Sequence, residues 1–346
     1  MALIGETALE NQRLSRTYRS RLDGGLSLLR GWFQENAPEI WAQLYDGSCN
    51  YVFLDQYLAV FVNQCWEDAV PLWQCKHAVL ALQSQYRHVR FHIPRAWDSI
   101  RAWEARRGHH NRVPIDYRLM ETLGITALSW GLEGGSRASM LITMFVLVRV
   151  GFFCLLRPGE LVNLRVGDVR LPGAGALTTS AVLAIRSPKN KRYVGQNQFV
   201  IVEDVVCIMW LRWLLRGLPR EVTLWPSSPE SFRVLFKKVS ERCGLGNLRL
   251  VPAGLRPGGT THLVSLGLDL SRIQFLGRWR VQSTMQVYVQ EAMSSLVLVS
   301  MSQSQVNTVS QITSQASQFV RNPPSLAWPY IFSRHRQWRS SSVLRK

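Results

Sequence analysis

The stretch LLRPGELVNLRVGDV at residues 155–169 places one arginine directly before a proline that can open a helix. Proline is tolerated in the first helical turn, so we expect Arg157 at the start of a short helix. The preceding residues 140–156 are nearly all apolar and almost long enough to span a bilayer. Arg149 interrupts them, and an arginine at the centre of a membrane helix costs roughly 3 kcal/mol or more. The sequence therefore predicts a buried helix that leads to Arg157.

Two further patterns lie downstream. Residues 254–262, GLRPGGTTH, contain Arg256, and residues 276–288 run from Leu-Gly-Arg-Trp to Tyr288. Arginine presents a planar fork of donors that fits two phosphate oxygens and keeps its charge. A tyrosine oxygen can form a covalent phosphate intermediate. Two arginines and one phenol are therefore the groups needed when a side chain, rather than water, attacks a phosphodiester.

In order and spacing, these segments resemble the tyrosine recombinase (phage integrase) family of DNA strand-exchange enzymes. The first segment matches the family's arginine box at Arg157, Glu160, Leu161, Leu164 and Asp168. The third resembles its Leu-Gly-His/Trp box followed by the nucleophile. Residues 182–192 resemble the hairpin that carries the catalytic lysine, which would be Lys189. Arg186, Lys191 and Arg192 share that turn and are alternative phosphate contacts. The matching segments cover roughly residues 114–295.

The resemblance implies a mainly α fold with a small β-hairpin or sheet, in which a helical core-binding domain precedes a catalytic domain of the DNA breaking-rejoining type. We expect four regions along the chain: a flexible basic arm (1–25), the core-binding-like domain (26–112), the catalytic domain (113–300), and a Ser/Gln-rich helix with a disordered basic tail (301–346). Periodicity predicts helices in the catalytic domain at 117–128, 137–156, 204–216, 228–243 and 258–266, and strands at 181–185 and 199–202. The helix expected over 302–320 has no evident partner in its own domain, so we predict that it docks on a neighbouring protomer.

The net charge of +18, from 41 Lys and Arg against 23 Asp and Glu, favours a polyanionic partner. With 47% hydrophobic residues the chain is expected to fold, so double-stranded DNA is the predicted partner, with self-assembly on it. A basic ribosome-associated or membrane-surface protein is the alternative on charge alone. The predicted DNA-binding residues are Arg87, Arg90, Arg95, Arg101, Arg106, Arg107, Lys191 and Arg192. A solvated charged face is the alternative for the arginines.

Cofactor signatures are missing from the sequence. The six cysteines form no Cys-x-x-Cys pair, which argues against a zinc site and a disulfide framework. No glycine-rich nucleotide loop and no secretory start are visible. We therefore expect an intracellular protein located with DNA, in a nucleus or nucleoid, that needs no metal and no nucleotide cofactor and is not in a membrane.

The resemblance also implies a mechanism. Tyr288 would attack the phosphodiester and give a 3′-phosphotyrosine, while Arg157 and Arg256 hold the non-bridging oxygens. Lys189 would protonate the leaving oxygen. The implied activity is that of a tyrosine-type DNA strand transferase, a site-specific recombinase or integrase of the kind found in mobile elements.

Two positions depart from the family pattern. Ala253 stands where the family has a histidine three residues before the second arginine, and His262 lies six residues after Arg256. In the third segment, counting forward from Leu-Gly selects Arg278, whereas counting back nine residues from Tyr288 selects Trp279. Two other functions therefore stay open: a catalytically degenerate DNA-binding module and a type IB topoisomerase-like enzyme.

Overall fold

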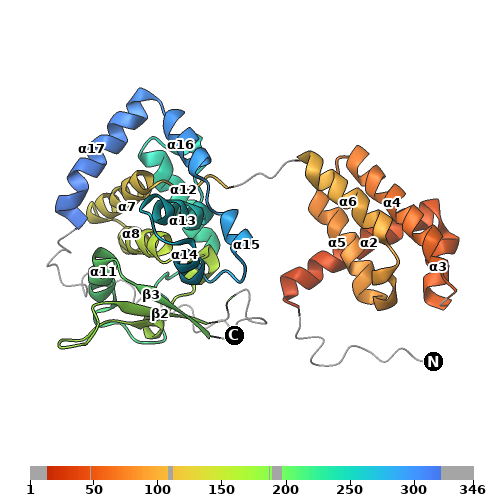
Figure 1. Cartoon of the computed structure of the whole chain (residues 1–346), viewed down its shortest axis with the longest axis horizontal. Helices are drawn as coiled ribbons and strands as arrows, with labels where there is room; N and C mark the ends of the chain where they lie inside the picture. Colours follow the sequence, from red (N-terminus) through yellow and green to blue (C-terminus); the bar gives the residue numbers. More distant parts are fainter. Residues whose placement is uncertain (1–13, 47, 108–111, 187, 189–196, 321–346) are drawn as a thin grey trace. The chain divides into compact units, whose positions relative to one another are not determined.

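The computed structural model describes residues 14–46, 48–107, 112–186, 188 and 197–320. It divides the chain into two compact units, residues 1–111 and 112–346 (Figure 1). The first unit is helical, and the second contains helices and one small sheet. The predicted fold class, mainly α with a small sheet, is confirmed.

The first unit is a bundle around one apolar core. Its elements are α2 (Arg16–Asn36), α3 (Pro38–Asp46), α4 (Tyr51–Glu67), α5 (Leu72–Gln85), the 3-10 helix η1 (Arg87–Phe91) and α6 (Pro94–Arg107). Asp55 of α4 is buried and accepts hydrogen bonds from the backbone amides of Arg95 (3.0 Å) and Ala96 (2.9 Å). Because these amides open α6 and have no partner within it, one carboxylate both caps α6 and joins it to α4.

The flexible arm predicted over residues 1–25 is wrong from Arg16 onward, because α2 begins there and Ser15 caps it. The arginines of this segment made it look polar in the sequence. The helix nevertheless has an apolar stripe that includes Leu22 and Leu29, both buried. Gly25 lets α2 approach α5 closely, since a Cβ at that position would come within 2.6 Å of the Ala78 backbone nitrogen.

The second unit surrounds a larger core. Its helices are α7 (Tyr117–Leu132), α8 (Ala138–Phe153), α9 (Pro158–Val162), α11 (Val205–Leu215), α12 (Pro229–Arg242), α13 (Leu255–Ser265), α14 (Leu270–Gly277), α15 (Gln282–Gln286), α16 (Glu291–Val299) and α17 (Gln303–Val320), with 3-10 helices η2 (Val166–Asp168), η3 (Gly246–Leu248) and η4 (Pro252–Gly254). The strands are β1 (Val169–Arg170), β2 (Ala181–Arg186) and β3 (Asn197–Val202).

The sheet is antiparallel in the order β1-β2-β3, with Leu183 opposite Val200. These two side chains are buried, whereas Phe199 and Ile201 on the other face are exposed. This alternation is expected of a sheet that packs on the core with one face. The segment between β2 and β3 that carries Lys189, Lys191 and Arg192 lies outside the described residues.

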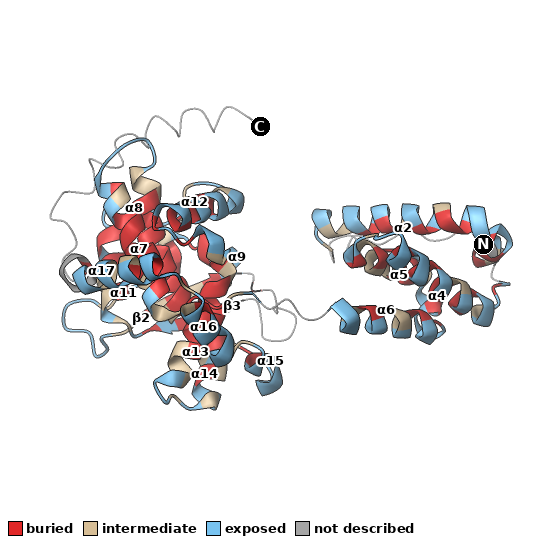
Figure 2. Ribbon diagram, turned by 90° about the horizontal axis from the view of Figure 1, so that it is seen from above, coloured by how far each residue is buried: buried red, intermediate tan, exposed pale blue. Residues whose placement is uncertain are grey.

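Helix α8 is the centre of this unit and is buried on nearly every side (Figure 2). Its one arginine, Arg149, is buried and paired with Glu121 of α7 (2.6 Å) and with Asp204, which caps α11 (3.6 Å). The predicted buried helix that leads to Arg157 is thus present. None of the described helices has the length and hydropathy that a bilayer crossing requires.

Helix α17 forms where the sequence predicted a helix, but the expectation that it lacks a partner in its own domain is wrong. It lies beside α7 (Figure 1), and Val309 and Val320 are buried in the core. The Gln305 side-chain amide donates to the Gly244 carbonyl (2.8 Å), and the Trp210 indole donates to the Val320 carbonyl (2.8 Å). Both partners are at least 61 residues away in sequence, a distance at which local periodicity carries no signal.

Candidate active site

Arg157 is fixed at the N-terminus of α9 by its own segment. Pro158 occupies the first helical position, and the Glu160 carboxylate folds back to accept from the Arg157 amide (3.0 Å). The same carboxylate accepts from Arg157 Nη1 (2.7 Å). Glu160 accepts hydrogen bonds both from the backbone amide at the start of α9 and from the Arg157 guanidinium. The sequence Arg-Pro-Gly-Glu therefore determines the local geometry by itself.

Arg256 is brought beside Arg157 by two glycines of α13. A Cβ at Gly258 would overlap the carbonyl of Ile115, and a Cβ at Gly259 would overlap the carbonyl of Phe152. The start of α13 therefore packs directly on the backbone of the segment before α7 and of the end of α8. Arg256 is only 2% exposed, and it donates to the carbonyl oxygens of Leu155 (2.7 Å) and Gly277 (2.5 Å).

Arg278 and Trp279 were the two alternatives for the position after Leu276-Gly277. Both side chains lie in the site, and they make different contacts there. Arg278 ends α14 with φ 59°, a left-handed conformation that costs a non-glycine residue roughly 1–2 kcal/mol. Its buried guanidinium donates to Glu160 Oε2 (2.8 Å). Trp279 packs against Gly277 and places its ring 4.1 Å from the Arg256 Cζ atom. Arg278 therefore joins the charged cluster, whereas Trp279 supplies a cation–π platform for Arg256.

Tyr288 lies in the turn that follows α15, and its amide donates to the Met285 carbonyl (2.7 Å). Its ring centroid is 5.1 Å from that of Trp279 and 5.4 Å from the Arg256 Cζ atom. The Thr261 hydroxyl of α13 donates to the Tyr288 carbonyl (3.4 Å). The backbone hydrogen bonds fix the position of Tyr288, and the ring contacts with Trp279 and Arg256 keep the phenol beside the arginine cluster. Of the predicted catalytic residues, the structure gathers Arg157, Arg256, Arg278, Trp279 and Tyr288, while Lys189 lies outside the described residues.

The charges in this site are unbalanced, because three guanidinium groups surround the one carboxylate of Glu160. Burial, and then the charges of Arg157 and Arg278, lower the pKa of Arg256 to about 9. Burial by itself would raise the pKa of Glu160, but Arg278 and Arg157 hold it below its ordinary value. Both groups are therefore charged at neutral pH.

Several buried donors of the site have no hydrogen-bond partner among the described residues. They are Arg256 Nε, Arg278 Nε, Arg278 Nη1 and Trp279 Nε1. Buried donors are seldom left unpaired, because each one costs about 1–3 kcal/mol. With the three guanidinium groups around Glu160, they make this the part of the described chain where an anion would be favoured.

A groove of about 590 Å³ adjoins the cluster between α9 and β2. Arg157 and Glu160 line one part of it, and Arg165 and Arg186 line another. The buried carboxylate of Asp168 pairs with Arg186 and accepts from the Arg165 amide (3.1 Å). Arg165 was not among the sequence candidates. Its position three residues before Asp168, in the same box, was the available signal.

Comparison with solved structures finds recombinases, among them two structures of XerH and one of XerA. A post-cleavage complex of the XerH site-specific recombinase bound to palindromic difH substrate aligns over 84% of this chain and 81% of its own, with 12% identity and a TM-score of 0.50. The pre-cleavage XerH–difH complex aligns over 74% and 71% (13% identity, TM-score 0.43), and XerA recombinase over 89% and 94% (17% identity, TM-score 0.39). No family model and no curated protein matches the chain.

The chain shares its fold with the XerH site-specific recombinase. This likeness agrees with the predicted fold class.

The structure also places Ala253 and His262, the two positions on either side of Arg256 that the sequence singled out. Ala253 lies half-buried in η4, three residues before Arg256. His262 instead stacks on Tyr117 (ring centroids 4.9 Å apart, 12° between planes) and also contacts Phe152. Burial lowers its pKa, so the ring is neutral at pH 7. These contacts make His262 a packing residue on the α7–α8 side of α13.

The arginines predicted to bind DNA in the first unit are all exposed there. They are Arg87 and Arg90 of η1 and Arg95, Arg101, Arg106 and Arg107 of α6. Arg101 pairs with Asp98, and the Arg106 guanidinium lies 5.6 Å from the Trp66 ring centroid. Lys191 and Arg192, predicted in the second unit, lie outside the described residues.

Proposed function

We propose that this protein is a DNA strand transferase of the tyrosine recombinase type, which acts on double-stranded DNA and assembles on it. The observation that carries the proposal is the cluster of Arg157, Arg256 and Arg278 around Glu160, with the Tyr288 ring centroid 5.4 Å from the Arg256 Cζ atom. Guanidinium groups suit a scissile phosphate, and the phenol is the adjacent nucleophile. The basic composition supports DNA as the source of that phosphate.

In the proposed reaction the Tyr288 hydroxyl loses its proton to water as its oxygen attacks phosphorus, and the bond to the 5′-oxygen of the next nucleotide breaks. Charge grows on the non-bridging oxygens, where Arg157, Arg256 and Arg278 stabilise it. Lys189 donates a proton to the leaving 5′-oxygen. The 3′-phosphotyrosine keeps the energy of the broken bond, so a second 5′-hydroxyl can reverse the step on another strand without ATP.

A catalytically degenerate DNA-binding protein is the second candidate, and Ala253 favours it. The side chain that would take the proton of Tyr288 is replaced by a methyl group. General acid–base assistance contributes roughly 10²–10⁴-fold to a rate. The two candidates therefore share DNA binding and differ in covalent chemistry.

A covalent-trapping assay separates them. A pool of duplexes with randomised cores, each nicked next to a possible cleavage position, loses the short 5′-hydroxyl strand after cleavage and so traps the adduct. We expect an SDS-resistant protein–DNA adduct whose recovered sequence also identifies the target. Tyr288→Phe should give none, while Tyr45→Phe, at an exposed phenol of α3, should behave as the parent. Salt-dependent binding without any adduct would support the binding module, and plasmid relaxation without strand exchange would support a type IB topoisomerase.

A further inference from the structure

The hydroxyl of Thr261 makes two hydrogen bonds to the segment that carries Tyr288. It donates to the Tyr288 carbonyl oxygen (3.4 Å) and accepts from the Gln290 amide (3.1 Å). Thr261 is 8% exposed and lies on α13, the helix whose first turn contains Arg256. A hydroxyl offers one donor and two acceptor sites, so this single side chain can bond the backbone on both sides of Val289 at once.

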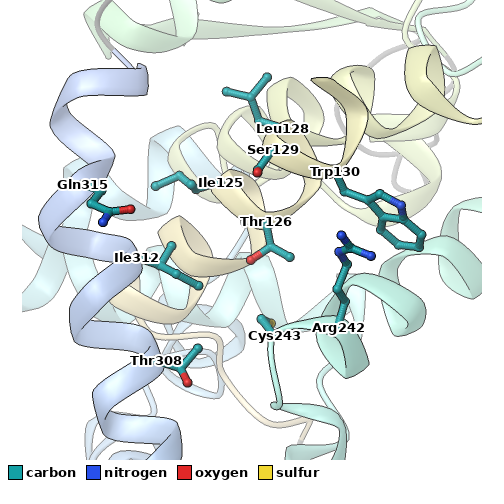
Figure 3. Close-up of a pocket in the computed structure, with 10 residues that line it drawn as sticks. All are labelled: Ile125, Thr126, Leu128, Ser129, Trp130, Arg242, Cys243, Thr308, Ile312 and Gln315. Carbon is teal, nitrogen blue, oxygen red and sulfur yellow. The ribbon is translucent and has the colours of Figure 1, made fainter. Parts of the chain in front are cut away.

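These bonds differ from those that threonine commonly makes inside a helix, where its hydroxyl donates to the carbonyl four residues back. Thr122 of α7 donates in this way to Arg118 (2.8 Å). Thr308 of α17, on the wall of the cavity drawn in Figure 3, does the same to Ser304 (2.9 Å). Thr261 instead bonds a segment 27 to 29 residues away in sequence. Its hydroxyl therefore joins two segments of the chain.

The turn around Tyr288 is otherwise closed by its own backbone. The Tyr288 amide donates to the Met285 carbonyl (2.7 Å), and the Val289 amide donates to the Gln286 carbonyl (3.0 Å). These bonds shape the turn after α15 but do not set its distance from the arginine cluster. The hydroxyl of Thr261 adds bonds from a different helix, the one that also carries an arginine of the cluster.

Helix α13 thus contacts the residue Tyr288 at two places. In its first turn, the Arg256 Cζ atom lies 5.4 Å from the Tyr288 ring centroid, and further along the helix Thr261 bonds the Tyr288 backbone. A hydrogen bond weakens steeply when its geometry changes, so the two bonds restrict where the phenol lies relative to Arg256. Attack by a side chain needs the reacting atoms about 3–3.5 Å apart, and a displacement of about 1 Å can cost roughly 10²-fold in rate.

We propose that Thr261 is a positioning residue for the nucleophile Tyr288. Its hydroxyl ties the backbone of residues 288–290 to the helix that carries Arg256, and so holds the phenol oxygen at attack distance from a phosphate bound by the arginines. Thr261 acts through Tyr288 and takes no part in the bond-making itself. The inference rests on the proposed strand-transfer function and adds one residue to it.

Two substitutions separate the hydroxyl from the shape of the side chain. Thr261→Val removes both hydrogen bonds and keeps the shape, whereas Thr261→Ser keeps the hydroxyl. Exchange of the Gln290 amide with solvent, followed by NMR in the full chain without DNA, should be at least 10-fold faster in Thr261→Val and within about 3-fold of the parent in Thr261→Ser. This measurement requires no activity.

The catalytic measurement is single-turnover trapping on the nicked duplex recovered above. Thr261→Val should lower the rate constant of adduct formation about 10- to 100-fold and leave DNA affinity within about 2-fold, and Thr261→Ser should restore the rate to within about 3-fold. Thr122→Val is the matched control, because Thr122 is fully buried and its hydroxyl bonds its own helix. That control should keep the rate constant within about 2-fold of the parent.

Several outcomes would overturn the role of Thr261. One is Gln290 exchange in Thr261→Val that stays at the parental rate, and another is a Thr261→Ser protein as slow as Thr261→Val. A smaller final yield of adduct at an unchanged rate constant would also count against it, because that result reports loss of folded protein. A parent that forms no adduct would refute the strand-transfer function and this role together, whereas an active parent with an equally fast Thr261→Val would refute the role of Thr261 alone.

Discussion

Replacing Glu160 by glutamine removes the carboxylate that joins Arg157 to Arg278 and leaves the shape of the side chain nearly unchanged. Glu160 is 7% exposed, accepts from both guanidinium groups and also caps α9 through the Arg157 amide. Loss of one partner from a buried ion pair costs about 3–5 kcal/mol, because the remaining charge stays buried without compensation. The amide oxygen of glutamine keeps one hydrogen bond, so we expect the free energy of unfolding to fall by about 3 kcal/mol.

Urea-induced unfolding, followed by hydrogen exchange of residues 155–165, measures this loss in the unit concerned. Glu203→Gln is the matched control, because Glu203 pairs with Arg272 at 3.0 Å but both side chains are more than half exposed. Surface pairs contribute about 0–1 kcal/mol, so the control should change little. Sulfate or phosphate should restore more stability to Glu160→Gln than to the parent, since an added anion replaces the lost charge.

The pH dependence has a defined sign. The arginines hold the pKa of folded Glu160 below its ordinary value of 4.5. The carboxylate therefore contributes stability that is fully present above the unfolded pKa and is lost as pH falls through the folded pKa. The difference between the parent and Glu160→Gln should be constant near neutrality and shrink in acid below about pH 4.5. A loss no larger than that of Glu203→Gln at pH 7 would refute the inference that this carboxylate balances the arginine cluster.

Three further predictions concern DNA. Changing Arg101, Arg106 and Arg107 together to alanine should flatten the dependence of log affinity on log salt for random duplex by up to about 2–3 units, measured by fluorescence anisotropy; binding that is insensitive to salt in the parent would remove DNA as the partner. Arg256→Ala should weaken both affinity and adduct formation, whereas Tyr288→Phe should abolish the adduct and keep affinity within about 2-fold; a Tyr288→Phe protein that still forms adduct would exclude this nucleophile. Ala253→His should raise the single-turnover cleavage rate at pH 7 by up to about 10²-fold without a change in affinity, and a rate unchanged or lowered by the imidazole would contradict lost proton transfer.

The parts of the fold that the sequence predicted are those determined locally. The apolar run around Arg149 predicted α8, and the β-prone runs at 181–185 and 199–202 predicted β2 and β3. Arg157 and Arg256 are carried by short segments with their own turn chemistry, namely proline at a helix start and glycines at a helix crossing. Proline and glycine favour particular backbone conformations, so each segment could be recognised from its own residues without its neighbours.

The parts that the sequence could not predict depend on contacts between distant segments. The docking of α17 needs Gly244 and Trp210. The ambiguity between Arg278 and Trp279 arose because counting from either end of the segment differs by one residue. The left-handed turn at Arg278 resolves it: that turn sends the guanidinium to Glu160 and lets the indole lie under Arg256. The spacing of residues along the sequence does not show where either side chain points.

In the proposed reaction, Arg278 and Ala253 act on different quantities. Arg278 adds positive charge that is fixed before any substrate arrives, so it would strengthen binding of the phosphate and of the more highly charged transition state. Ala253 offers no proton acceptor, which would change the rate of attack and leave the charge around the phosphate intact. Extra electrostatic stabilisation would lower the barrier for proton transfer from Tyr288 to water. Under this proposal DNA affinity is no guide to activity, and only a covalent adduct that depends on Tyr288 distinguishes a slow strand transferase from a DNA-binding protein without strand-transfer activity.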